Sequence, residues 1–340
     1  MIRFIVTVFL AISAACVQAA VGVTQVASIE GDKPVTVYYP TTSAETAVQR
    51  GPFKLSLAVD AEPARGNGRL IVISHGSGGN AWVHADLARA LVDAGFVVAL
   101  PMHKGDNALD PSQPGPESWR MRPIEVSHAI DAVGRDTRFA SLSLDKVGLY
   151  GMSAGGHTAL TLAGGRWSPA LFRDHCAQHI AEDFPACVGL ITRLRGDFLD
   201  GPKKALAVSA IKHRFDDATP QSHTDPRIQA IVAGVPFAAD FDPASLANPA
   251  VPLGFVTARH DQWLAPRFHS DRILAACKSC ELIADLPDGG HGALLSPLPP
   301  PEVLGDIARD LLADPPGFDR RQLADVDRRI TAFFTRHLLQ

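Results

Sequence analysis

The chain has 340 residues, of which 46% are hydrophobic and 20% are charged, and its formal net charge is −4. This length and composition suit one large α/β domain with a sizeable core, and they exclude disordered, collagen-like and coiled-coil chains. Lysine and arginine are scattered along the chain, so the sequence lacks the basic patch that binding to nucleic acid or a membrane surface would need. We therefore expect no nucleic-acid partner.

Residues 1–19 have the layout of a secretory signal peptide. Arg3 precedes a largely apolar stretch of twelve residues, Phe4 to Ala15, and Val17-Gln18-Ala19 offers small residues for a cleavage site. We predict cleavage after Ala19 and a periplasmic or secreted mature chain. A retained membrane anchor is the alternative, but a bilayer span needs roughly 20 apolar residues, so we expect no stable membrane span in the mature chain.

The cysteines support export. Cleavage would remove Cys16, for which a lipid anchor is an alternative, and would leave four cysteines, an even number that indicates disulfides in an exported chain. The predicted local pairs are Cys176–Cys187 and Cys277–Cys280. A redox motif at 277–280 lacks a surrounding βαβ pattern, and a zinc site of His175, Cys176 and His179 lacks a second ligand pair. We expect no metal and no cofactor.

The order of predicted elements indicates the fold class. Residues 32–39 and 53–59 alternate like surface strands. From residue 70 onward apolar strands alternate with helices, which predicts an α/β fold whose mostly parallel sheet has helices on both faces. The predicted strands are 70–73, 96–100, 146–150, 227–235, 252–258 and 280–286. The predicted helices are 82–94, 122–138, 154–163, 266–276, 303–313 and 322–338. The alternation fails between 164 and 225, so we predict a lid-like insertion at about 165–225.

The strongest functional motif is Gly-Met-Ser-Ala-Gly at residues 151–155. It follows the predicted strand 146–150 and opens the predicted helix 154–163, which is the setting in which such a motif holds a nucleophile. The sharp turn would expose the Ser153 hydroxyl at a helix N-terminus, where negative charge is favoured. We predict that Ser153 is a nucleophile; a structural serine is the alternative.

A serine hydroxyl needs a general base, and His291 is our candidate. It follows the last predicted strand in the segment 288–292 (DGGHG), where three glycines leave it little to pack against and predict a mobile connection. His260 and His269 are the competing histidines. A surface-loop histidine without catalytic function is the remaining alternative for His291.

The histidine in turn needs a carboxylate to orient it, and Asp261 follows the predicted strand 252–258. Asp240 and Asp242, which follow the preceding strand, are the alternatives. A purely structural role for Asp261, as the cap of the following helix, is a further alternative. The chain order serine, aspartate, histidine favours Asp261.

The segment 74–80 (SHGSGGN) follows the first central strand. Its three glycines allow backbone N–H groups to converge on one point, as an oxyanion hole requires. We predict the N–H groups of Ser77 and Ala154 as the oxyanion donors, and we expect His75 to form hydrogen bonds beneath the loop. A phosphate-binding loop is the alternative, but the sequence lacks both a following Lys-Ser/Thr and a GxGxxG motif.

Taken together, these motifs resemble a known family. The segments that carry the resemblance are SHGSGGN at 74–80, GFVVALPMHKGDN at 95–107, Arg122-Pro123, GMSAGG at 151–156 and GGHG at 289–292. They are similar to the predicted dienelactone-hydrolase-like group of α/β-hydrolases, which resembles platelet-activating-factor acetylhydrolases and, more distantly, polyester-cleaving cutinases. The similarity covers roughly residues 34–295. It implies an α/β-hydrolase domain over 20–340 that hydrolyses carboxylic esters without a metal or organic cofactor.

Two positions distinguish this chain within the resemblance. Gly234-Val235-Pro236 stands where the acetylhydrolases carry their acid, so the placement of Asp261 is closer to that of dienelactone hydrolases. Those enzymes usually have a cysteine nucleophile, whereas this chain has Ser153. We expect an exported serine esterase that acts on a small-molecule ester. The ester would have either a small acyl group or a lipid-like structure. The alternatives are a peptidase or amidase, a silent binding protein with the same shell, and a redox protein acting through residues 277–280.

Overall fold

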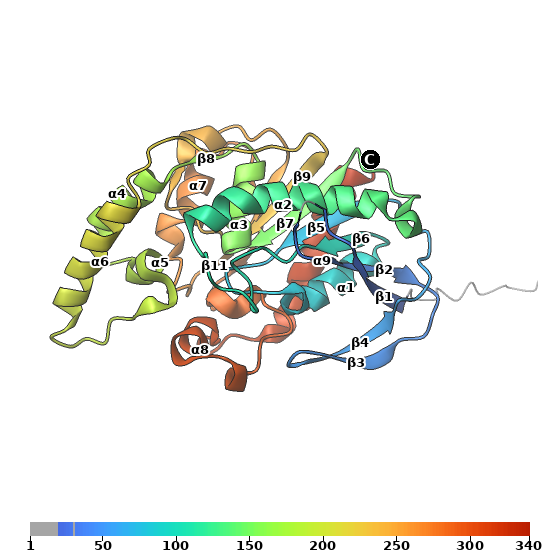
Figure 1. The fold of residues 1–340 in the computed structure, drawn as a ribbon, viewed down its shortest axis with the longest axis horizontal. Coiled ribbons are helices and arrows are strands. Elements are labelled where there is room, and N and C mark those ends of the chain that lie inside the picture. The colour runs from blue at the N-terminus through green and yellow to red at the C-terminus, as the bar shows by residue number, and fades with distance from the viewer. Residues whose placement is uncertain (1–19, 30) are drawn as a thin grey trace, which may run out of the picture.

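The centre of the protein is a ten-stranded, mostly parallel sheet (Figure 1). The computed structural model describes residues 20–29 and 31–340, so the predicted signal peptide lies outside the described residues. Six neighbouring parallel strands form its main part: β5 Leu70–Ser74, β6 Val97–Leu100, β7 Val147–Met152, β9 Ile228–Gly234, β11 Leu253–Ala258 and β12 Glu281–Leu286. The strand order is β12-β11-β9-β7-β5-β6-β2-β1-β4-β3.

Four N-terminal strands extend the sheet beyond β6. They are β1 Ala20–Val26, β2 Val35–Thr41, β3 Thr46–Arg50 and β4 Phe53–Val59. β2 pairs antiparallel with both β6 and β1. The prediction of a surface strand at 32–39 is therefore wrong, because every residue of β2 is buried inside the sheet. Two of its buried polar side chains have partners: the Tyr39 hydroxyl donates to the Ala61 carbonyl and the Thr41 hydroxyl to the Glu62 carbonyl.

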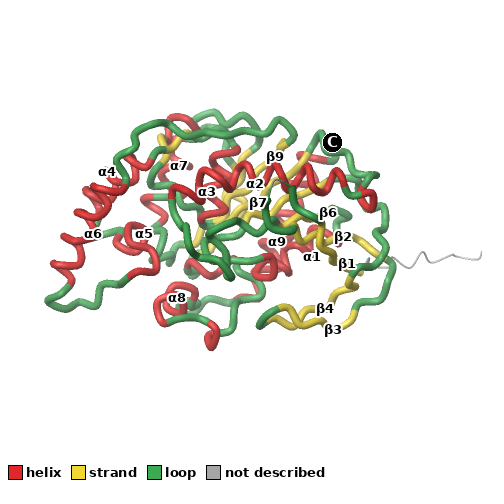
Figure 2. Tube along the Cα trace, in the orientation of Figure 1, coloured by secondary structure: helices red, strands yellow, loops and turns green. Residues whose placement is uncertain are grey.

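Helices cover both faces of the sheet, as Figure 2 shows with strands in yellow between helices in red. The helices that pack against the sheet are α1 Ala85–Asp93, α2 Pro116–Arg135, α3 Ala154–Leu162 and α9 Leu323–Leu338. Within β5, Leu70 and Val72 pack in the core beneath α2 and α3, while Ile71 and Ile73 pack in the core beneath α1 and α9. A strand covered on both faces must be apolar throughout, which is why 70–73 reads as a continuous apolar run.

The predicted insertion contains three helices and one short strand. α4 Pro169–His179, α5 Phe184–Val188 and α6 Asp200–Arg214 lie at the end of the molecule away from β1–β4, beside α7 Ser270–Ala276 (Figure 1). The short strand β8 Arg166–Trp167 pairs with β10 Phe241–Asp242 outside the central sheet. The last remaining helix is α8 Asp306–Leu312. No helix in the described residues is long and apolar enough to cross a membrane.

Both predicted disulfides are confirmed. Cys176 in α4 bonds to Cys187 in α5, and Cys277 bonds to Cys280 in the connection between α7 and β12. The first bridge closes a segment of the insertion and the second a tight local turn. Because Cys176 is bonded to Cys187, its sulfur is not available as a ligand for the zinc site considered for His175, Cys176 and His179.

Candidate active site

Ser153 occupies a sharp turn between β7 and α3. It is a non-glycine residue with φ 58°, a conformation that costs on the order of 1–3 kcal/mol and must be held by its surroundings. Its backbone N–H donates to the Gly234 carbonyl at 3.0 Å, and its carbonyl accepts from the N–H of Phe237 at 3.1 Å. The turn also needs Gly155, because a Cβ there would lie 1.9 Å from the Ser74 carbonyl oxygen. Backbone packing from neighbouring strands thus fixes the serine in its strained conformation.

His291 and Asp261 meet Ser153 at the carboxyl ends of the parallel strands. The Nδ1 atom of His291 lies 2.8 Å from Oδ2 of Asp261, and its Nε2 lies 3.0 Å from the Ser153 hydroxyl oxygen. An ionised carboxylate only accepts hydrogen bonds, so the proton of the neutral imidazole is on Nδ1. Nε2 is then free to accept the proton of the Ser153 hydroxyl. The three residues predicted as a triad therefore form one hydrogen-bonded series.

The carboxylate of Asp261 is held from its other side. Its Oδ1 atom accepts the backbone N–H groups of Trp263 at 2.9 Å and Leu264 at 2.8 Å, which leaves Oδ2 for His291. Asp261 and His291 are 4% and 5% exposed, so water competes little for the hydrogen bond between them. Asp261 therefore caps the following turn and orients the histidine at once.

The glycines around His291 serve close packing, so the prediction of a mobile connection is wrong. Residues His291–Leu294 form a buried 3₁₀ turn. A Cβ on Gly292 would lie 2.3 Å from the Leu312 carbonyl oxygen at the end of α8. The N–H of His260 donates to the Gly289 carbonyl at 2.9 Å, so the segments after β11 and β12 are tied together.

The competing residues lie elsewhere. His260 is exposed, and Asp242 pairs with Arg166 on the surface. Asp240 is fully buried and its Oδ2 lies 3.0 Å from Nε2 of His157, within α3. None of these alternatives contacts Ser153.

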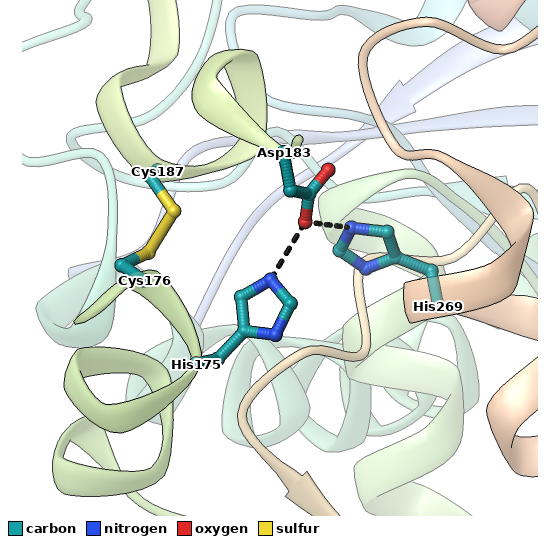
Figure 3. The surroundings of a disulfide bond; sticks show 5 residues. All are labelled: His175, Cys176, Asp183, Cys187 and His269. Carbon is teal, nitrogen blue, oxygen red and sulfur yellow. Dashed lines mark hydrogen bonds and ion pairs between the residues drawn. A yellow bond between two sulfur atoms is a disulfide. The ribbon is translucent and has the colours of Figure 1, made fainter. Parts of the chain in front are cut away.

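His269 belongs to a separate buried cluster next to the Cys176–Cys187 bridge (Figure 3). The Nδ1 atom of His269 accepts the N–H of Ala238 at 3.0 Å, so its Nε2 carries the proton and donates to Oδ2 of Asp183 at 3.2 Å. Nε2 of His175 contacts the same oxygen at 2.7 Å. Burial alone would raise the pKa of Asp183, but the hydrogen bonds from the two histidines outweigh it and lower the pKa to about 2.

This cluster replaces the zinc site that the sequence allowed. Asp183 belongs to the insertion, whereas His269 precedes α7, so the carboxylate fastens the insertion to the main domain. The described residues hold no group of three or more side chains arranged to bind a metal ion.

The segment 74–80 lies directly against Ser153. A Cβ on Gly76 would lie 3.3 Å from the Cβ of Ser153. β5 and β7 are neighbours, and β6 lies on the other side of β5, so the segments after β5 and β7 leave the sheet at a change of winding direction where α/β proteins commonly bind ligands. In the described part of the chain, the predicted oxyanion donors, the N–H groups of Ser77 and Ala154, have no hydrogen-bond partner.

His75 forms hydrogen bonds within this segment, as expected. Its Nδ1 donates to the Gly76 carbonyl at 2.7 Å, and its Nε2 accepts the N–H of His103 at 3.3 Å. Burial lowers the pKa of both His75 and His103, which keeps the two adjacent rings neutral.

A second series of serine, histidine and carboxylate lies beneath the segment and was not predicted. The Ser74 hydroxyl is 2.7 Å from Nε2 of His103, whose Nδ1 is 2.6 Å from Oε2 of Glu125 in α2. Their exposed fractions are 0%, 0% and 4%, so no substrate reaches this serine. The series therefore braces the end of β5 against α2, and only the Ser153 series is accessible.

A groove of about 660 Å³ lies elsewhere, between the insertion and α8. Its lining includes Leu190, Arg195, Lys203 and Ile307 but neither Ser153 nor His291. It does not enter the site described above.

The arrangement suits proton transfer from a serine hydroxyl through an imidazole that a buried carboxylate orients. Comparison with known proteins adds no name to it: no protein-family model matches the chain, and no curated protein matches it. The chain is an α/β protein with a large, mostly parallel central sheet, whose candidate site lies at the carboxyl ends of neighbouring strands.

Proposed function

We propose that this protein is a serine esterase of the α/β-hydrolase fold, which cleaves carboxylic esters through an acyl-enzyme. The observation that carries the proposal is the hydrogen-bonded series from Asp261 through His291 to Ser153. The nucleophile turn after a central strand and the chain order of the three residues add support. So does the resemblance of the loop motifs to the dienelactone-hydrolase-like group.

The geometry supports a two-step reaction. In the first step the Ser153 hydroxyl oxygen attacks the ester carbonyl carbon while Nε2 of His291 takes the hydroxyl proton. Asp261 stabilises the resulting imidazolium, and the N–H groups of Ser77 and Ala154 donate to the carbonyl oxygen as it becomes an oxyanion. The tetrahedral intermediate collapses, the carbon–oxygen bond to the alcohol breaks, and His291 returns the proton to that alcohol.

In the second step water replaces the alcohol. His291 removes a proton from water, the hydroxide attacks the acyl carbon on Ser153, and the same donors stabilise the second oxyanion. Collapse releases the carboxylic acid, and the proton on His291 returns to the Ser153 oxygen. The free enzyme is regenerated with no net change in its protonation.

The proposal is tested with Ser153→Ala. Purified wild-type protein should hydrolyse p-nitrophenyl acetate and should be labelled at Ser153 by a fluorophosphonate, as judged by peptide mass spectrometry. Ser153→Ala should lose both properties while keeping the wild-type circular dichroism spectrum and melting temperature. Retained hydrolysis by the variant, or an unlabelled wild type, would overturn the proposal. Matched amide substrates test the peptidase alternative: a peptidase should cleave the amide at a substantial rate, whereas an esterase should leave it essentially uncleaved.

We also propose export with removal of residues 1–19. The two disulfides support it, because such bonds persist in oxidising compartments. N-terminal sequencing of protein from the periplasm or medium of an expressing bacterium should give a chain that begins at Ala20. A cytoplasmic chain that keeps Met1 would contradict the proposal.

A further inference from the structure

The segment that carries Ser77 has little rigidity of its own. Gly76, Gly78 and Gly79 surround Ser77, and glycine loses more conformational freedom on ordering than any other residue. Gly78 has φ 66°, a left-handed conformation that suits glycine. Ser77 and Gly78 are also exposed, so core packing does not fix them. The N–H of Gly79 donates to the Gly76 carbonyl at 3.0 Å and closes the turn, but it does not bind Ser77 itself. A contact from outside the segment is therefore needed to fix the Ser77 N–H.

Asp106 supplies that contact. One oxygen of its carboxylate, Oδ1, accepts both the hydroxyl of Ser77, in a short hydrogen bond, and the backbone N–H of Gly78 at 3.1 Å. Two consecutive residues of the flexible segment are thus bound to a single atom. The Ser77 hydroxyl is the only polar side-chain group among residues 76–79, so it is the one side chain through which a partner can hold this turn.

The Asp106 carboxylate is itself held by Arg122 of α2. Nη2 of Arg122 lies 2.8 Å from Oδ2 of Asp106, and its Nη1 donates to the His75 carbonyl at 2.6 Å. Asp106 is 1% exposed and Arg122 is 0% exposed. The Arg122 guanidinium therefore binds both the Asp106 carboxylate, which holds the segment, and the His75 carbonyl at the start of the segment.

The charge of Arg122 also matters for the chemistry. A lone carboxylate beside an oxyanion hole would repel the developing negative charge, whereas the ion pair is neutral overall. Burial alone would raise the pKa of Asp106, but the adjacent Arg122 charge and the hydrogen bonds outweigh it and lower the pKa. The carboxylate therefore stays ionised and keeps accepting from the segment across the working pH range.

We propose that Asp106 is a positioning residue, which fixes the Ser77 N–H at the point where the oxyanion forms. This inference rests on the proposed esterase function. Preorganised donors stabilise an oxyanion because they need no rearrangement during the reaction, and losing one donor typically costs about 100- to 1,000-fold in kcat. A donor that is present but untethered should lose part of that effect.

Ser77→Ala is the sharpest test, because it keeps the backbone N–H of Ser77 and removes one of the two hydrogen bonds to Asp106, while the bond from the Gly78 N–H remains. We expect kcat for p-nitrophenyl acetate to fall roughly 10- to 100-fold, a part of the loss for a whole donor, with KM within twofold of wild type. An alkyl trifluoromethyl ketone, which forms a tetrahedral oxyanion on the serine, should bind more weakly by a similar factor. A merely structural role for Ser77 would not lower the affinity for the ketone in parallel with kcat.

Thr24→Val is the matched control. Thr24 is buried in β1, and its hydroxyl likewise donates to an aspartate, Oδ1 of Asp60, at 2.7 Å. The variant loses that hydrogen bond and the one that the hydroxyl accepts from Arg138, both far from Ser153 in strand order. It should therefore keep wild-type kcat and ketone affinity. If Ser77→Ala matches this control in both measurements, the positioning role of Asp106 is refuted.

A failure of the inference differs from a failure of the proposed function. If wild type is labelled at Ser153 and hydrolyses esters while Ser77→Ala is unimpaired, only the positioning role falls. If wild type is not labelled and has no esterase activity, the proposed function falls and the inference falls with it. Asp106→Asn provides a second variant, which should shift kcat and ketone affinity in the same direction as Ser77→Ala.

Discussion

Asp261→Asn should abolish nearly all esterase activity while leaving the fold intact. The reason is that the two carboxylate oxygens of Asp261 have different partners. Oδ1 of Asp261 accepts two backbone N–H groups, from Trp263 and Leu264, so the carbonyl oxygen of an asparagine must take that position. The amide NH₂ then faces Nδ1 of His291 at the place of Oδ2. Because NH₂ donates, His291 must present a lone pair at Nδ1 and carry its proton on Nε2. An Nε2–H cannot accept the proton of Ser153.

The expected loss follows from this wrong tautomer. Replacing an orienting aspartate by asparagine without a change of geometry typically lowers kcat by about 10⁴, which corresponds to about 5 kcal/mol of transition-state stabilisation. The assay is hydrolysis of p-nitrophenyl acetate together with the rate of fluorophosphonate labelling, and both should fall. The melting temperature should change little, because the two backbone hydrogen bonds remain.

Asp240→Asn is the matched control for this prediction. Asp240 is also a buried aspartate that contacts a histidine, since its Oδ2 lies 3.0 Å from Nε2 of His157. The exchange leaves the side chains of Ser153, His291 and Asp261 unchanged, and His157 keeps its backbone N–H on the Ser153 carbonyl at 3.0 Å. We therefore expect kcat to stay close to that of wild type even where stability falls. Activity of Asp261→Asn within tenfold of wild type would refute the reasoning about the tautomer.

Three further predictions concern stability. Gly155→Ala places a methyl group 1.9 Å from the Ser74 carbonyl, so we expect a loss of about 3 kcal/mol or insoluble protein; a melting temperature within 3 °C of wild type would contradict the predicted clash. Replacing Cys176 and Cys187 by alanine opens a bridge with a sequence separation of 11, which should cost about 2–3 kcal/mol in urea unfolding. Burial and the nearby negative charge of Asp86 raise the pKa of Asp327 from 3.8 to about 7. The folded state therefore binds this proton more tightly, so stability is lost as the pH rises from about 4 to 7, by up to about 4 kcal/mol, and Asp327→Asn should remove that part of the pH dependence.

The inner parallel strands were predictable because strands such as β5 and β7 are buried on both faces and are therefore almost entirely apolar. β5 and β7 appear at the expected places to within two residues. β2 was misjudged because its tyrosines and threonines look like a half-exposed strand, and only the tertiary structure supplies the partners of the Tyr39 and Thr41 hydroxyls. α2 begins at Pro116, six residues before the expected start at 122. Pro123 therefore lies inside the helix, at a position from which proline is normally excluded.

The sequence predicted the three side chains of the candidate site, but not the residues that hold the neighbouring segment 74–80. Ser153, Asp261 and His291 each follow a predicted strand, and parallel strands bring such positions to one edge. Arg122 and Asp106 stood in motifs that were recognised, but their contact depends on how α2 crosses the segment after β6. No periodicity or spacing encodes that crossing, so the sequence alone gave no sign that the two residues hold Ser77.

The cluster around Asp183 affects how the protein can be truncated. Its hydrogen bond to His269 continues to the N–H of Ala238, and the neighbouring Phe237 donates its own N–H to the carbonyl of Ser153. The insertion is thus joined through a short series of hydrogen bonds to the backbone of Ser153. A shortened protein made by deleting residues 165–225 would lose one end of that series, so this segment helps to support the candidate site and is not a detachable module.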